Sequence, residues 1–126
     1  MIGVVKVTNK KSIRRGDIYY VRGCNDTLGA EQKASSGRPA IIVSNNIGNE
    51  HSKIKQIVYI TKQAKKWIPT HVVINSSPFR SIAICEQIIT VSDERIELYV
   101  GHCTEEEMKE IDKALAISIG LDEHYK

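Results

Sequence analysis

Five apolar runs follow one another between residues 17 and 91, and residues that favour turns separate each run from the next. The runs span 17–21, 40–45, 55–61, 70–75 and 81–91. They are rich in β-branched and aromatic residues, and no helical periodicity lies between them. The segment 45–52 is expected to be a turn, and the last run is expected to kink near Glu86. Short strands at this spacing favour a small antiparallel barrel or sandwich over a parallel α/β sheet.

The pattern changes after residue 103, where apolar residues recur at helical spacing. This spacing predicts a helix over 104–121 with one face packed on the core. The apolar stripe consists of Met108, Ile111, Leu115 and Ile119. Thr104 and Glu107 form the sequence pattern of a capping box, and Gly120 fits the C-terminal cap. The expected class is therefore mainly β with helices (α+β): a small antiparallel β-barrel with a C-terminal helix.

Composition fits one soluble domain. The chain has 126 residues, of which 41% are hydrophobic and 26% charged, and this length is enough for one core. No apolar run approaches membrane-spanning length, and the first residues lack the apolar region of a signal peptide. Three cysteines at irregular spacing, Cys24, Cys85 and Cys103, argue for free thiols in a reducing compartment. We therefore expect a cytoplasmic protein with no membrane partner.

Neither metal spacing nor net charge identifies a function by itself. The four histidines, His51, His71, His102 and His124, have no ligand spacing relative to one another or to the cysteines, so no metal site is expected. The formal net charge is +3, and the basic residues gather in the first two thirds of the chain. Such a balance permits a polyanionic partner, but solvated faces explain it equally well.

One arginine stands at the mouth of a predicted strand. Residues 22–37 form a long loop rich in turn formers, which is typical of functional or disordered segments. Arg38 follows this loop, and Pro39 then begins the second apolar run. Proline is tolerated at the first residue of a strand and holds the preceding residue extended. This placement suits an anion site, although a lone arginine at a strand end is more often a solvated rim charge.

Other polar residues also lie at strand edges. They are Glu31 and Gln32 in the long loop, Asn45 and Thr61 at strand ends, and Glu86 and Gln87 inside the last apolar run. Taken alone, three of them have purely structural explanations: Thr61 ends a strand, Asn45 forms a turn and Glu86 protects a sheet edge from pairing with another chain. Glu86 and Gln87 interrupt an apolar strand, so they are expected to face a cleft, an edge or an interface. Together the set is compatible with one groove.

The order of these motifs resembles that of the MazF/PemK toxins, which are sequence-specific endoribonucleases of toxin–antitoxin pairs. The likeness is carried by "RRGDIYYV", "GAEQ", "GRPAIIVSN", "IVYIT", "ICEQIITV" and "KALAISIGL". It runs from about Arg14 to Leu121. The chain is accordingly divided into an N-terminal extension, 1–12, and a toxin-like domain, 13–122.

The resemblance implies an SH3-like barrel that forms a homodimer with a groove for single-stranded RNA. It further implies cleavage without a metal or other cofactor, neutralisation by a cognate antitoxin, and contact with DNA only indirectly, through the antitoxin complex. By the same resemblance Arg38 and Thr61 are the catalytic pair. The RNA-binding positions that it implies are Glu31, Gln32, Pro39, Asn45, Glu86 and Gln87.

Elementary chemistry is compatible with these roles. A ribonuclease without a metal can use the 2′-hydroxyl of its substrate as the nucleophile, which leaves a 2′,3′-cyclic phosphate and a 5′-hydroxyl. The guanidinium of Arg38 is a good fork for phosphate oxygens, and Thr61 can donate a hydrogen bond to the same group. A guanidinium keeps its proton in proteins. Chemistry therefore favours Glu31 as the base, whereas the resemblance favours Arg38, and the sequence leaves this open.

The chain departs from the family pattern in three places, and functions other than RNA cleavage remain as alternatives. The stretch between Gln32 and Arg38 is longer than usual, Ile89 stands where the family commonly has arginine, and residues 1–12 are an extension that is disordered, an added strand or a start-site error. The alternatives are a non-catalytic barrel that binds a partner, a topoisomerase-inhibiting toxin of the same fold, and an inactive relative. Ile89 is the feature that favours the last.

Overall fold

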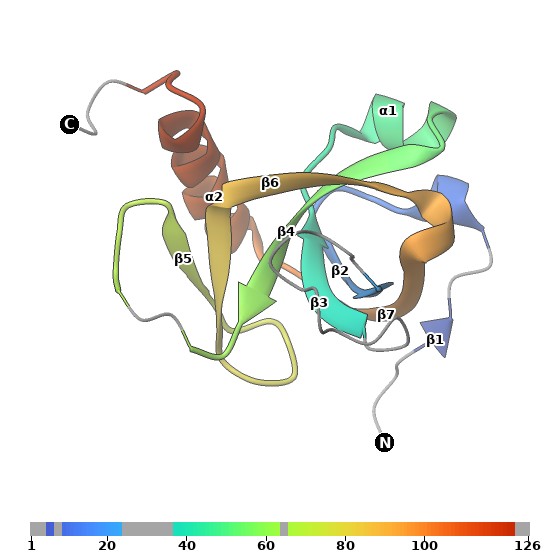
Figure 1. Ribbon diagram of the computed structural model, residues 1–126, viewed down its shortest axis with the longest axis horizontal. Coiled ribbons are helices and arrows are strands. Elements are labelled where there is room, and N and C mark those ends of the chain that lie inside the picture. The colour runs from blue at the N-terminus through green and yellow to red at the C-terminus, as the bar shows by residue number, and fades with distance from the viewer. Residues whose placement is uncertain (1–4, 7–8, 24–36, 64–65, 123–126) are drawn as a thin grey trace.

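Seven strands form one antiparallel sheet in the order β1-β7-β2-β3-β4-β6-β5, and a C-terminal helix packs against it (Figure 1). The computed structural model describes residues 5–6, 9–23, 37–63 and 66–122. The strands are β1 (Val5–Lys6), β2 (Asp17–Arg22), β3 (Gly37–Ile42), β4 (Ile54–Thr61), β5 (His71–Ile74), β6 (Ser81–Ser92) and β7 (Ile96–His102). The helices are α1 (Asn46–His51) and α2 (Glu105–Ser118), with single 3₁₀ turns η1 (Lys10–Ser12) and η3 (Asp93–Arg95).

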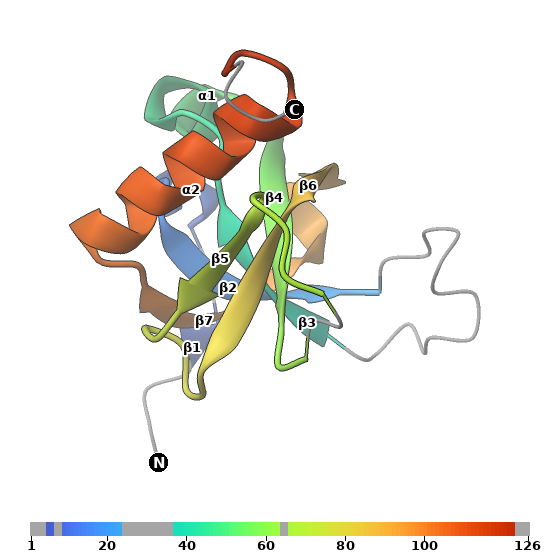
Figure 2. The ribbon, with the colours of Figure 1, turned by 90° about the vertical axis from the view of Figure 1, so that its left-hand side faces the viewer.

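The central strands are buried on both faces, because alternate residues point to opposite sides of a sheet. One face packs under α2 and forms the helix-side core, which includes Ile18, Ile41, Val58, Ile111 and Ala114. Figure 2 shows α2 lying across this face. The opposite face forms the second core, which consists of Ile13, Tyr19, Val21, Ala40, Ile42, Ile57, Tyr59, Val91 and Ile96. Burial on both faces explains why the runs that form β3 and β4 are almost continuously apolar.

The predicted class, α+β with an antiparallel sheet and a C-terminal helix, is confirmed, but closure into a barrel is not. Within the described residues no ladder joins the edge strands β1 and β5, so the sheet is curved and open. Helix α2 packs against β5 and β6, and Val72 and Ile74 of β5 enter the helix-side core. The helix therefore covers apolar surface that a closed barrel would bury between strands.

The C-terminal helix begins as predicted and ends earlier. Thr104 Oγ1 accepts from the backbone N–H of Glu107, and the Glu107 carboxylate accepts from the Thr104 N–H, so the capping box is present. Gly120 follows the helix with a φ of 84°, a left-handed conformation that suits glycine. Ile119 was expected in the core, but it is 59% exposed because α2 ends at Ser118.

Two further elements were missed, and part of the N-terminal segment forms a strand. The expected turn over 45–52 contains the short helix α1, whose N-cap Asn45 accepts from the Gly48 N–H at 2.7 Å. Strand β7 was not predicted, because its alternation is hidden among the charges of the segment 93–97. Of the predicted N-terminal extension, Val5–Lys6 adds the strand β1 at the edge of β7.

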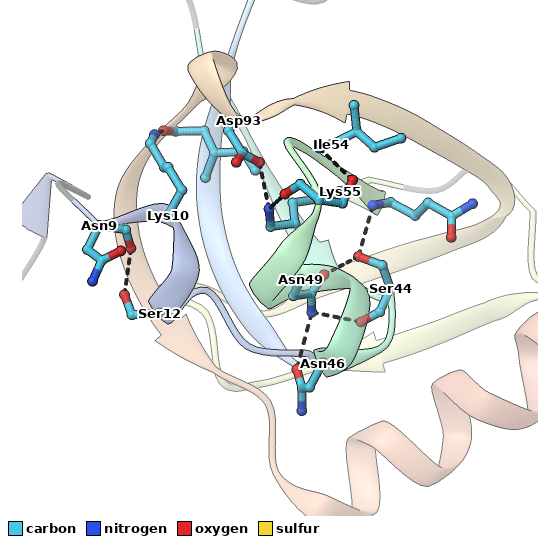
Figure 3. A network of polar contacts seen from close by, with 12 residues as sticks. Asn9, Lys10, Ser12, Ser44, Asn46, Asn49, Ile54, Lys55 and Asp93 are labelled. Atoms are coloured by element: carbon cyan, nitrogen blue, oxygen red, sulfur yellow. Dashed lines mark hydrogen bonds and ion pairs between the residues drawn. The ribbon is translucent and has the colours of Figure 1, made fainter.

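A polar network anchors the start of β4 (Figure 3). Lys55 is fully buried, and its Nζ donates to Asp93 Oδ1 at 2.7 Å and to the Ser52 carbonyl at 2.9 Å. Beside it, Asn49 is 1% exposed and donates from Nδ2 to the Ser44 carbonyl at 2.8 Å. These bonds satisfy groups that would otherwise be buried without partners.

Candidate functional site

Strands β3 and β4 carry the predicted catalytic pair, Arg38 and Thr61, beyond the same end of their ladder. The register pairs Ala40 with Tyr59 and Ile42 with Ile57. The ladder ends at the pair Ala40–Tyr59, and Arg38 and Thr61 each lie two residues beyond that pair, at the same end of the two strands. Side chains two residues apart on a strand share a face. Arg38 and Thr61 therefore lie on the face of Ala40 and Tyr59, which is the face of the second core.

Arg38 is stacked on an aromatic ring. Its guanidinium carbon lies 4.1 Å from the centroid of the Tyr59 ring, within cation–π range. Tyr59 is only 1% exposed, whereas Arg38 is half-buried. The cation thus lies over the ring where the apolar second core meets solvent.

Thr61 ends β4 with its hydroxyl engaged in a local turn. Oγ1 donates to the Gln63 carbonyl at 3.2 Å and accepts from the Gln63 N–H at 3.3 Å. A threonine hydroxyl rotates to suit its partners. Thr61 can therefore turn its proton toward a phosphate placed between it and Arg38, while Oγ1 goes on accepting from the Gln63 N–H.

The kink predicted near Glu86 is present as a large bulge in β6. Val58 pairs with Ile88, but Ile60 pairs with Ala83, so the four residues 84–87 oppose the single residue Tyr59. Bulges re-aim side chains and are over-represented beside active sites. Glu86 and Gln87 are both exposed in this bulge. The polar interruption of the apolar run therefore lies beside the ring that carries Arg38.

Glu86 is turned toward β5 and is held there. Its Oε1 accepts from the Thr70 hydroxyl at 2.8 Å, and its Oε2 lies 3.1 Å from His71 Nε2. Burial acts to raise the pKa of Glu86, but the hydrogen bonds, first of all the one from Thr70, outweigh it and lower the pKa. The carboxylate therefore stabilises the bulge in its ionised form.

Other predicted site residues are spread more widely. Pro39 pairs with Tyr20 of β2, beside Arg38. Asn45 lies past the opposite end of β3, seven residues from Arg38, where it caps α1 and lines a cleft of about 180 Å³. One chain therefore does not bring Asn45 to Arg38. Glu31 and Gln32 lie outside the described residues, as does most of the loop that differs in length from the family pattern.

The structure adds residues that the sequence reasoning missed. Tyr59 was overlooked within an apolar run, although it stands two residues before Thr61 and thus shares its face. Lys62 follows Thr61 and places its Nζ 4.5 Å from the centroid of the Phe79 ring, which extends the positive surface beyond Thr61. Ile89, the apolar departure from the family pattern, pairs with Ile57 and packs against the second core.

Cys85 and Cys103 are not suited to act as nucleophiles. Cys85 and Cys103 are free and buried, which confirms the prediction for these two, while Cys24 lies outside the described residues. Burial is the main cause that raises the pKa of each thiol to about 12. In the part of the chain that the structure describes, no three His, Cys, Asp or Glu side chains gather as metal ligands. No helix there has the length and apolar character needed to cross a membrane.

Comparisons with known proteins agree with this geometry. A family described as PemK-like, MazF-like toxin of type II toxin–antitoxin systems matches residues 14–119. Endoribonuclease EndoA of Bacillus subtilis (strain 168) is 33% identical over 114 residues, covering 86% of this chain and 96% of that protein.

Solved structures show the same fold. An endoribonuclease in complex with its cognate antitoxin, from a mycobacterial species, superposes with a TM-score of 0.73 at 28% identity, over 88% of this chain and 98% of that one. MazF from Deinococcus radiodurans superposes with a TM-score of 0.68 at 17% identity, over 86% and 96% of the two chains. At that identity the second likeness concerns the fold alone.

Proposed function

The chain belongs to the PemK-like, MazF-like toxin family of type II toxin–antitoxin systems, and we propose that it is an endoribonuclease that cuts single-stranded RNA at a short sequence without a metal ion. The observation that supports this proposal is the Arg38 guanidinium lying over the Tyr59 ring at the solvent edge, on the face that Arg38 and Thr61 share. The relative EndoA, at 33% identity, is named an endoribonuclease.

The reaction uses the 2′-hydroxyl of the RNA. Its oxygen attacks the adjacent phosphorus, the bond from phosphorus to the 5′-oxygen breaks, and that oxygen takes a proton from solvent. The products carry a 2′,3′-cyclic phosphate and a 5′-hydroxyl. Arg38 stabilises the charge that develops on the phosphate oxygens, and Thr61 donates a hydrogen bond to the same group. Because a guanidinium keeps its proton, Glu31 is assigned as the acceptor of the 2′-hydroxyl proton, and Glu31→Gln tests that assignment.

The wider surroundings of the pair serve RNA binding in this proposal. Pro39 and the bulge residues Glu86 and Gln87 border the groove, and Gln32 is assigned to RNA binding as well. Asn45, which is remote within one chain, contributes from the partner protomer of a homodimer.

A mycobacterial relative is known in complex with its cognate antitoxin. We accordingly assign this chain an antitoxin whose acidic segment folds over the basic groove. Contact with DNA occurs only through that complex, and the protein acts in the cytoplasm.

Cleavage of a long single-stranded RNA by the purified protein in EDTA tests the function. Cuts at one short recurring sequence, with 2′,3′-cyclic phosphate ends, are expected. Arg38→Ala should lower kcat by roughly 10²–10³-fold, as the removal of one donor to a developing oxyanion does elsewhere. Arg14→Ala, which removes an exposed arginine at the other end of the sheet, is the matched control and should cut normally.

Two results would contradict the proposal. Intact RNA after incubation with folded, dimeric protein would favour a non-catalytic binding module. If Arg38→Ala cuts RNA as fast as the wild type, Arg38 has no role in catalysis, although the protein is still a ribonuclease.

A further inference from the structure

We propose that Tyr59 is a positioning residue for catalysis: its buried ring holds the Arg38 guanidinium in the plane in which it meets the scissile phosphate. The inference rests on the proposed ribonuclease function and adds a residue to it. Its basis is the distance of 4.1 Å between the guanidinium carbon and the ring centroid, together with the burial of the ring.

The ring is a rigid support. Tyr59 is 1% exposed and belongs to the second core. Across β3 it faces Ala40, a small residue that leaves the ring its space. Across β6 it faces the four bulged residues 84–87 in place of a single partner. The register thus places the bulge beside this ring, and the packing of the core leaves the ring little freedom to reorient.

Stacking leaves the reactive edge of Arg38 free. A guanidinium carries its five N–H donors in its own plane, so a contact through its face uses none of them. Within the described part of the chain, no carboxylate or carbonyl oxygen accepts from Arg38. The in-plane donors can therefore meet two phosphate oxygens at once. An arginine on a flexible stem would otherwise have to be ordered during the reaction, which lowers its effect on rate.

Two substitutions test whether the effect of Tyr59 depends on its aromatic ring. Tyr59→Phe keeps the aromatic face, whereas Tyr59→Leu removes it and leaves an apolar side chain. A cation–π contact at a partly desolvated site corresponds to a loss of up to about 30-fold when it is removed. We expect kcat of Tyr59→Leu to fall about tenfold with KM changed less than about twofold, because the ring touches Arg38 and not the RNA. Tyr59→Phe should stay within about twofold of the wild type.

The matched control is Tyr19→Leu. Tyr19 is also buried in the second core, at 4% exposure, and it lies opposite Ala40 on the other neighbouring strand. Its ring contacts Tyr99. All variants are assayed well below their melting temperatures, with circular dichroism confirming the fold. If Tyr19→Leu loses as much activity as Tyr59→Leu, general loosening of the core explains the effect and the inference is overturned.

A measurement on the free protein separates this inference from the function. In the NMR spectrum the side-chain protons of Arg38 should be shifted upfield by the Tyr59 ring current in the wild type and in Tyr59→Phe, but not in Tyr59→Leu. If the RNA is not cut but this NMR pattern is seen, the ribonuclease function is refuted and the contact between Arg38 and Tyr59 is still supported. A cut RNA with equal kcat for the wild type and Tyr59→Leu, or with Tyr59→Phe as slow as Tyr59→Leu, would refute the positioning role alone.

Discussion

The buried ammonium of Lys55 makes the fold sensitive to substitution of its partly exposed partner, Asp93. The Lys55 side chain is 0% exposed and its partner Asp93 is 17% exposed, with 2.7 Å between Nζ and Oδ1. Asp93→Ala leaves the ammonium buried with the Ser52 carbonyl as its remaining partner in the network of Figure 3. Removing one partner of a buried ion pair typically costs about 3–5 kcal/mol. Because Asp93 is partly accessible and water can replace it, we expect the lower limit, about 3 kcal/mol.

That free energy converts into a measurable melting shift. An unfolding entropy of about 2.1 cal/mol/K per residue gives roughly 0.26 kcal/mol/K for 126 residues. Asp93→Ala should therefore lower the Tm by about 11 °C in a thermal scan followed by circular dichroism at pH 7. Lys55→Met removes the charge with its need for a partner and should keep the Tm within about 4 °C of the wild type or raise it.

The exposed ion pair between Arg22 and Glu97 supplies the comparison. Its side chains are 43% and 35% exposed at a separation of 3.1 Å. Glu97→Ala should change stability by less than about 1 kcal/mol, because solvent screens the pair. If Asp93→Ala melts no lower than Glu97→Ala, or if Lys55→Met is the least stable of the three, the reasoning about the buried ammonium fails.

Three further predictions concern α2 and the bulge. Thr104→Ala removes the N-cap of α2 and should lower stability by about 1 kcal/mol, roughly 4 °C in Tm; an unchanged Tm would show that the capping box contributes nothing. Burial acts to raise the pKa of Glu107, but hydrogen bonds from Ser76, Asn75 and Thr104 outweigh it and lower the pKa. Its ionised form therefore stabilises the fold above about pH 4.5, and this contribution is lost as the pH falls through the lowered value. The Tm difference between the wild type and Glu107→Gln should accordingly shrink in scans from pH 7 to pH 3, and a constant difference would contradict the assignment. Glu86→Ala releases the bulge from Thr70 and His71 and should slow RNA cleavage more than Glu86→Gln, which keeps an acceptor; equal rates for the two would argue against anchoring.

The sequence predicted those parts of the fold that depend on neighbouring residues in the chain, and it missed parts that depend on packing. Periodicity predicted β4 and α2. A strand buried on both faces and an amphipathic helix each have a characteristic spacing of apolar residues. The helix α1 was hidden, because its Asn- and Gly-rich sequence is also typical of a turn, and the cap at Asn45 decided between the two. Closure of the sheet was mispredicted, because only the packed chain shows that α2 covers the face beside β5.

The site depended on a non-local quantity, the strand register. The sequence selected Arg38 and Thr61, but no pattern around either residue indicates that both lie beyond the same end of the β3–β4 ladder. The role of Tyr59 was invisible for the same reason: in the chain it is one more apolar position, and only the pairing with Ala40 brings it under Arg38. Asn45 shows the reverse case, since it resembled a groove residue in sequence but lies at the other end of β3.

The most direct test of the ribonuclease is a single change in the substrate. Once the cut position is mapped in EDTA, a short RNA of that sequence is made with one 2′-deoxynucleotide on the 5′ side of the cut. Attack by the 2′-hydroxyl predicts that this RNA binds with unchanged affinity and stays intact, while the all-ribose RNA is cut, and is cut far more slowly by Arg38→Ala. Cleavage of the deoxy-substituted RNA at the same phosphate would contradict the 2′-hydroxyl mechanism and the roles assigned to Arg38 and Thr61.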